Sequence, residues 1–158
     1  MKAVSVVTIK KELQHKTPAE LMELCLRLSK FKKENKELLT YLLFESHDER
    51  NYIETVKMEL EEQFETINTH SFFYIKKSVR KILRNLKKYA RYSTKKETEV
   101  ELLLYFCHRL KDFKPSIHRD KVLLNMYERQ VLSIKKLIST FHEDLQYDYN
   151  LKLEELGE

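Results

Sequence analysis

The most pronounced feature of this sequence is a segment rich in lysine and arginine. Ten of its 30 lysines and arginines lie between Ile75 and Lys96, where there is no acid, and the other 20 face 25 acids elsewhere in the chain. The net charge of +5 therefore comes from this one segment. Because ammonium and guanidinium groups pair with carboxylates and phosphates, the segment predicts an anionic partner.

A helix would place eight of these cations on one face. At about 100° per residue, the eight fall within an arc of about 140°, opposite apolar residues such as Ile75, Val79 and Leu86. Like charges at i,i+4 spacing cost roughly 0.2–0.5 kcal/mol per pair, so a negative charge outside the helix is expected to offset them. The stripe consists of Lys76, Lys77, Arg80, Lys81, Arg84, Lys87, Lys88 and Arg91. The six residues predicted to contact a partner are Lys77, Arg80, Lys81, Arg84, Lys88 and Arg91.

Several sources could supply the negative charge. An acidic protein surface is one, and a second copy of this chain is another, because residues 143–158 hold six acids against Lys152. Nucleic acid is an alternative, since a cationic stripe neutralises phosphates irrespective of sequence. A membrane surface is not expected, because the apolar face is needed for the core. The preceding helix could also contribute, through the glutamates Glu54, Glu61, Glu62 and Glu65.

Other residue patterns with catalytic or metal-binding potential are weak. Glu12 and His15 have the Glu-x-x-His spacing of di-iron bundles, but the spacing has no second copy. Cys107 precedes His108, yet adjacent helical residues point about 100° apart, so Cys25 and Cys107 are both predicted to be core residues. The single glycine is penultimate, which excludes a phosphate-cradling loop. The sequence therefore predicts no enzyme activity, metal, cofactor or small-molecule substrate.

The elements that must position the basic stripe are predicted to be helices. One glycine and two prolines leave little for tight turns, whereas Leu, Lys and Glu favour helix. Capping boxes, in which Ser or Thr precedes Glu by three residues, are predicted at Thr17/Glu20, Ser46/Glu49 and Thr94/Glu97. Apolar periodicity places the helices near residues 4–15, 18–32, 34–45, 49–68, 71–92, 95–113, 119–142 and 144–156.

Short connectors between these helices favour a single all-α domain over residues 1–158. We expect seven or eight antiparallel helices, in a helical bundle or a short α-solenoid. The solenoid alternative depends on a short internal repeat: segments 37–41 and 101–105 share Glu, Leu, Leu and Tyr at matching positions. If this repeat reflects duplication, residues 18–68 and 71–142 are two copies of a three-helix unit.

The function predicted from these observations is a non-enzymatic helical interaction module whose basic face engages an acidic protein. The alternatives are sequence-independent nucleic-acid binding through the same face, and a purely structural helical protein or homo-oligomer with no exposed functional basic site. No stretch approaches the roughly 18 apolar residues of a membrane span, and the start of the chain lacks the pattern of a secretory signal. A soluble, cytoplasmic protein is therefore expected.

Overall fold

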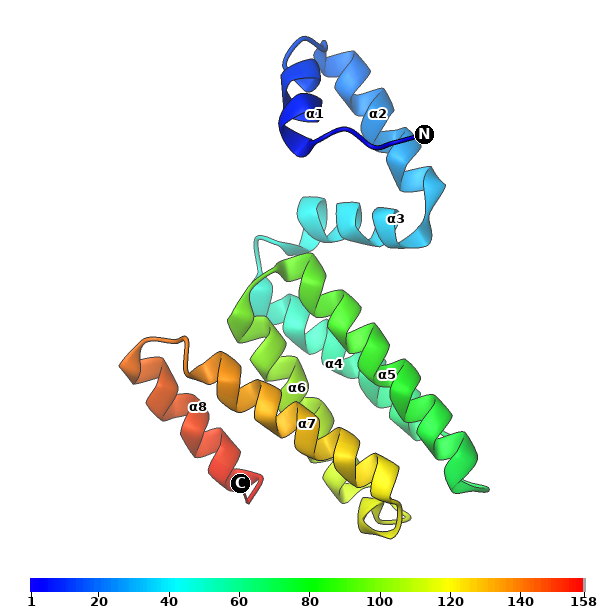
Figure 1. Ribbon diagram of the computed structural model, residues 1–158, viewed down its shortest axis with the longest axis vertical. Helices are drawn as coiled ribbons and strands as arrows, with labels where there is room; N and C mark the ends of the chain where they lie inside the picture. Colours follow the sequence, from blue (N-terminus) through cyan, green and yellow to red (C-terminus); the bar gives the residue numbers. More distant parts are fainter. Residues whose placement is uncertain (158) are drawn as a thin grey trace. The chain divides into compact units, whose positions relative to one another are not determined.

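The computed structural model describes residues 1–157 and confirms the predicted all-α class (Figure 1). These residues form eight α-helices and no strand, with a π-helical turn at Tyr41–Glu45 and a 3-10 turn at Ile117–Arg119. The helices after residue 45 pack against each other as in a helical bundle. They are α1 (Val6–Leu13), α2 (Pro18–Phe31), α3 (Lys33–Thr40), α4 (Glu49–Glu65), α5 (Phe72–Ser93), α6 (Lys96–Asp112), α7 (Lys121–Ile138) and α8 (Glu143–Glu155).

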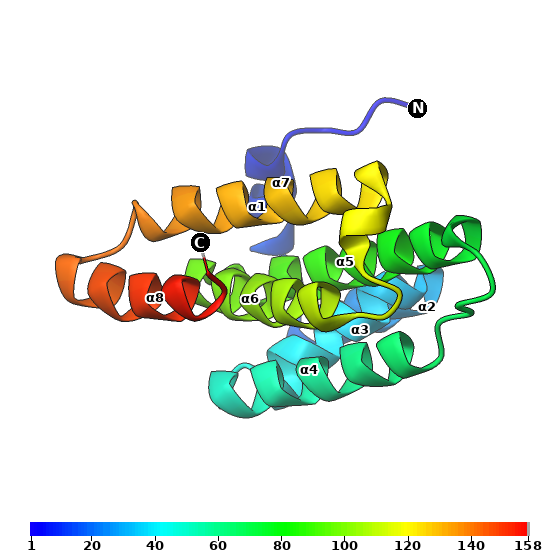
Figure 2. The same cartoon turned by 90° about the horizontal axis from the view of Figure 1, so that it is seen from below.

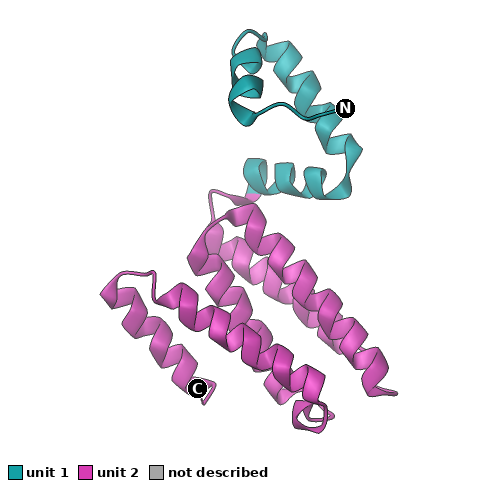
Figure 3. Ribbon diagram, in the orientation of Figure 1, with its two compact units in different colours: residues 1–44 teal, residues 45–158 magenta. Residues whose placement is uncertain are grey.

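The chain divides into two compact units, Met1–Phe44 and Glu45–Glu158 (Figure 3). The first contains α1 to α3 and the second contains α4 to α8. The boundary falls inside residues 18–68, the first copy of the suggested duplication, because α4 belongs with the later helices. That suggested copy is therefore not a compact unit. The expectation of one domain over residues 1–158 stays a prediction.

Local contacts hold the three helices of the first unit, whose buried residue, Tyr41, lies after α3. Thr17 and Glu20 form the predicted capping box, and Asn35 on α3 donates a side-chain hydrogen bond to the carbonyl of Leu28 on α2, at 2.8 Å. No residue of α1, α2 or α3 is buried. The prediction that Cys25 is a core residue is consequently wrong: its thiol lies on an exposed helix.

The second unit is built around α6, which packs against α4, α5 and α7. Figure 2 shows α6 between α7 on one side and α4 on the other. Three consecutive leucines, Leu102 to Leu104, are buried in α6, and so is Cys107, as predicted. A helix that buries consecutive positions has no solvent face over that stretch, so it must be surrounded by other helices.

Two of the three predicted capping boxes are wrong. Asp48, not Ser46, caps α4, and its carboxylate accepts a hydrogen bond from the backbone N–H of Asn51 at 3.0 Å. Thr94 ends α5 instead of beginning α6, because its backbone is left-handed, with φ 60°. Glu49, the other residue of the predicted Ser46/Glu49 box, contacts α6 instead. Its carboxylate accepts a hydrogen bond from the hydroxyl of Thr98, at 2.6 Å.

Asp120 joins the start of α7 to α5. Its carboxylate accepts hydrogen bonds from the backbone N–H groups of Val122 and Leu123, each at 3.0 Å, and forms an ion pair with Lys76 at 3.1 Å. Burial acts to raise the pKa of Asp120, but the bonds from Leu123 and Lys76 outweigh it, and the pKa lies below its ordinary value.

Asp120→Ala should lower the free energy of unfolding by about 1–2 kcal/mol, because both backbone donors lose their acceptor. Chemical denaturation followed by circular dichroism measures the loss. Asp120→Asn, which keeps the capping oxygen, should recover most of it. An unchanged stability in Asp120→Ala would show that the cap does not stabilise α7.

Candidate functional site

The basic stripe lies on the exposed face of α5. Ile75, Val79 and Leu86 are buried on the opposite face, as the periodicity predicted. Five of the six residues predicted to contact a partner are exposed, and within residues 1–157 none of the five forms an ion pair with an acid. They are Lys77, Arg80, Lys81, Arg84 and Arg91, which we call the basic face.

The sixth predicted residue, Lys88, is in a different environment. It is only half-exposed, and its Nζ lies 4.9 Å from the ring centroid of Tyr89. The Tyr89 hydroxyl donates to the Glu59 carboxylate at 2.5 Å, so this end of α5 is engaged with α4. Lys76, another member of the stripe, pairs with Asp120. The structure therefore gathers five of the predicted residues on one open surface and places Lys88 at its edge.

The acidic stripe of α4 does not pair with the basic face in the part of the chain that the structure describes. Glu61 accepts hydrogen bonds from Arg109 Nε, at 2.6 Å, and from the Tyr105 hydroxyl, both on α6. Glu54 pairs with Lys57 on its own helix, at 3.1 Å. Burial acts to raise the pKa of Glu61, but Tyr105 and Arg109 lower it below its ordinary value, so Glu61 is ionised and committed to α6.

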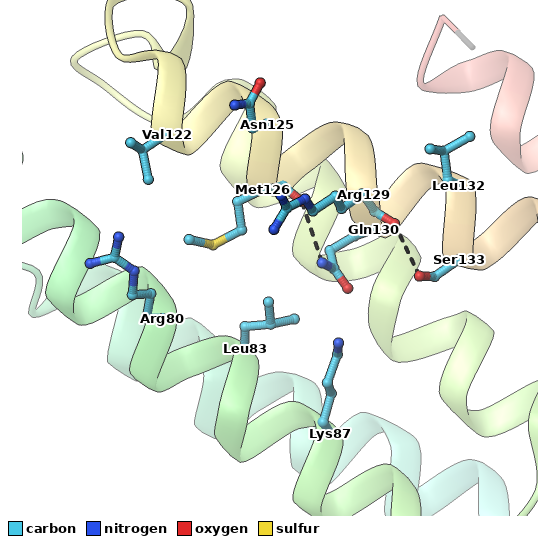
Figure 4. Close-up of a pocket in the computed structure, with 10 residues that line it drawn as sticks. All are labelled: Arg80, Leu83, Lys87, Val122, Asn125, Met126, Arg129, Gln130, Leu132 and Ser133. Atoms are coloured by element: carbon cyan, nitrogen blue, oxygen red, sulfur yellow. Dashed lines mark hydrogen bonds between the residues drawn. The ribbon is translucent and has the colours of Figure 1, made fainter.

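A groove runs between α5 and α7, beside the basic face. Both helices pack closely on α6 and less closely on each other, which leaves a space of about 760 Å³ between them. Figure 4 shows side chains entering this α5–α7 groove from both helices. Its lining has three cations and no acid: Arg80, Leu83, Lys87, Val122, Asn125, Met126, Arg129, Gln130, Leu132 and Ser133.

The α5–α7 groove contains an unsatisfied hydrogen-bond acceptor. Gln130 is only 5% exposed, and its Nε2 donates weakly to the carbonyl of Met126, at 3.4 Å. Its Oε1 is buried and accepts no hydrogen bond from any described residue. In Figure 4 the Gln130 side chain extends from α7 towards Lys87 and Leu83 on α5. A buried acceptor without a donor costs about 1–3 kcal/mol, so a partner with a donor would be favoured here.

The groove also has apolar surface. Leu83 and Met126 line it from the two helices, and Leu132 is 65% exposed at its edge. The groove therefore combines apolar side chains, cations and an unpaired acceptor.

The residues considered for catalysis or metal binding do not form a cluster. Glu12 and His15 lie near the end of α1 in the first unit, whereas Cys107 is buried in α6. Among residues 1–157 there is no group of three or more His, Cys, Asp or Glu side chains placed to bind a metal ion. None of the described helices is both long and apolar enough to cross a membrane.

Sequence reasoning missed the α7 side of the groove. Arg129, Gln130 and Met126 are spaced three and four residues apart with Val122 and Ser133, so periodicity groups them on one face of a helix. Periodicity does not say which helix lies opposite that face. Lys87 was part of the predicted stripe but was not selected as a contact residue, although it lines the groove.

Comparison with known proteins adds no functional information. The chain matches no protein-family model and shows no significant similarity to a curated protein or to a solved structure.

Proposed function

We propose that this protein is a non-enzymatic interaction module that binds an acidic protein segment through the basic face and the α5–α7 groove. One observation carries the proposal: the five exposed cations on α5 form no ion pair within residues 1–157, although Glu99 of α6 lines a hollow beside Arg84 and Arg91, and the adjoining groove is lined by Arg80, Lys87 and Arg129 without an acid. Repulsion within this surface is relieved when carboxylates bind beside it.

The shape and chemistry of the groove favour protein over nucleic acid. The apolar side chains of Leu83, Met126 and Leu132 would contact apolar residues of a partner, and the unpaired Oε1 of Gln130 would accept a hydrogen bond from it. Contacts of this kind contribute most where water is excluded, and they give the pairing its specificity. Binding of nucleic acid through its phosphates would use mainly the cations, so the experiment must be able to detect it as the alternative outcome.

The test compares a protein-like probe with nucleic acids. One probe is a fluorescein-labelled helical peptide with glutamate on one side and leucine at i, i+3 and i+4 positions; the others are labelled duplex DNA and single-stranded RNA. Fluorescence anisotropy at about 50 mM and about 200 mM salt measures binding. The peptide should bind more tightly than either nucleic acid near 200 mM salt, because nonspecific phosphate binding weakens by orders of magnitude over this range.

Charge reversal locates the binding surface. Arg80→Glu/Arg84→Glu should weaken peptide binding about tenfold or more, because two attractive charges become repulsive. The control is Lys121→Glu/Lys135→Glu, which makes the same change in net charge at residues of α7 that do not line the groove. Equal loss in the two variants would contradict a localised surface. Tight DNA binding without peptide binding would replace this function with the nucleic-acid alternative.

A further inference from the structure

The outer face of α8 matches the α5–α7 groove in charge and in apolar content. At about 100° per residue, Tyr147 and Leu151 share a stripe about 100° wide with the acids beside them. Tyr147 is 67% exposed and Leu151 is 42% exposed, whereas Tyr149 and Leu153, on the opposite face, are buried in the second unit. The acids in the exposed stripe are Asp144, Asp148 and Glu155.

The acids of this stripe are not neutralised within the described chain. None of Asp144, Asp148 and Glu155 forms an ion pair in residues 1–157. The one lysine of α8, Lys152, is turned to the other side, where its Nζ lies 2.5 Å from the carboxylate of Glu101 on α6. The exposed stripe of α8 is therefore purely anionic, as the groove is purely cationic.

We propose, on the basis of the function proposed above, that the acidic segment bound in the α5–α7 groove is α8 of a second copy of this chain. Asp148 and Glu155 would face the cations of the groove, and Leu151 would contact its apolar residues. Tyr147 would enter the groove with its ring against Leu83 and Met126. On binding, the Gln130 amide would turn towards the groove, where its Oε1 would accept a hydrogen bond from the Tyr147 hydroxyl, which supplies the missing donor.

Both surfaces belong to the second compact unit, so each copy offers one groove and one α8. Two copies related by a two-fold axis would exchange α8 helices reciprocally and satisfy both grooves, which closes the assembly as a dimer. Since the contact depends on several exposed charges, the dimer should weaken as salt rises.

The first experiment reverses the charges on each surface of the full chain and measures its mass by sedimentation velocity. Arg80→Glu/Arg129→Glu makes the groove acidic, and Asp148→Lys/Glu155→Lys makes the α8 stripe basic. Wild type should form a dimer at about 50 mM salt that dissociates at about 500 mM. Each variant alone should associate about tenfold or more weakly than wild type, because like charges then meet.

Mixing the two variants separates direct pairing from a general effect of net charge. In the mixture, one contact has the native charges and the other has both charges reversed, so each contact is again complementary. Dimers should therefore reappear on mixing. Lys121→Glu/Lys135→Glu, which matches the groove variant in net charge, should dimerise like wild type. Failure of the mixture to associate would overturn the proposal.

The hydroxyl of Tyr147 gives a second readout. Tyr147→Phe should weaken the dimer about 25-fold, because the two-fold dimer loses two hydrogen bonds, each equivalent to about fivefold. In a Gln130→Leu background the same change should have no effect, because the acceptor is gone. Tyr74→Phe, at an exposed tyrosine of α5, is the matched control. An equal effect of Tyr147→Phe in both backgrounds would contradict the pairing with Gln130.

The outcomes distinguish this inference from the proposed function. A chain that stays monomeric at low salt but binds the glutamate and leucine peptide would overturn the inference and leave the function intact. A dimer that is insensitive to both charge reversals would place self-association on another surface and also overturn the inference. A chain that neither dimerises nor binds the peptide would overturn both.

Discussion

Replacing Phe106 by alanine should lower the free energy of unfolding by about 3–5 kcal/mol. Phe106 is 0% exposed in the middle of α6, and its ring centroid lies 5.8 Å from that of Phe64 on α4. Phe64 in turn contacts Phe113, at 6.5 Å between centroids. Removing the Phe106 ring leaves a cavity against these rings, and the surrounding helices can fill it only in part.

Chemical denaturation followed by circular dichroism measures this loss, with Phe73→Ala as the matched control. Phe73 is exposed on α5, so the same change there should alter stability by no more than about 0.5 kcal/mol. Similar losses in both variants would show that the cluster around Phe106 does not stabilise the core. Since small domains are stable by about 5–15 kcal/mol in total, the Phe106 variant should lose a large part of its stability.

Glu101→Gln should lower the free energy of unfolding by about 1–2 kcal/mol. Glu101 on α6 lies 2.5 Å from the Nζ of Lys152 on α8 and 3.6 Å from that of Lys57 on α4. A neutral amide keeps the size of the side chain but loses the attraction to both cations. The half-exposed position of Lys152 limits the loss, because solvent screens the pair.

The pH dependence of the free energy of unfolding tests the ion pairs of Glu101. Burial acts to raise its pKa, but Lys152 and Lys57 lower it below its ordinary value near 4.5. A carboxyl whose pKa is lowered in the folded state contributes stability above its unfolded pKa and loses it as the pH falls through the folded pKa. Wild type should therefore lose stability below about pH 4.5, and Glu101→Gln should show a flatter curve there. Lys152→Met in the Glu101→Gln background should cost less than in wild type; equal costs would contradict the coupling.

The sequence predicted the helical class and the two-faced character of α5 because both depend on local periodicity. Ile75, Val79 and Leu86 recur at helical spacing, and burial of one face follows from that spacing alone. The partners of the acidic helix could not be predicted in the same way. Glu61 was expected near the basic face but pairs with Arg109, because α4 packs against α6 as well as α5. Which neighbour a face meets depends on contacts between distant segments.

The capping errors have a similar origin. Thr94/Glu97 has the spacing of a capping box, but Thr94 adopts a left-handed conformation that ends α5, and no local pattern distinguishes the two roles. Cys25 lies on an apolar helix that its own unit does not bury, so periodicity alone predicted a core position that does not exist. Gln130 could not be selected as a candidate from the sequence, because only the folded structure shows that its Oε1 is buried without a hydrogen-bond donor.

The absence of buried side chains in α1, α2 and α3 affects the heat capacity of unfolding. That quantity rises with the apolar area that unfolding exposes to water, and the same area governs the denaturant dependence of stability. Melting these three helices exposes less apolar area per residue than melting the second unit, whose core side chains are almost fully covered. The heat capacity change and the denaturant dependence should therefore come mainly from the second compact unit. Values calculated from the length of the whole chain would be too large.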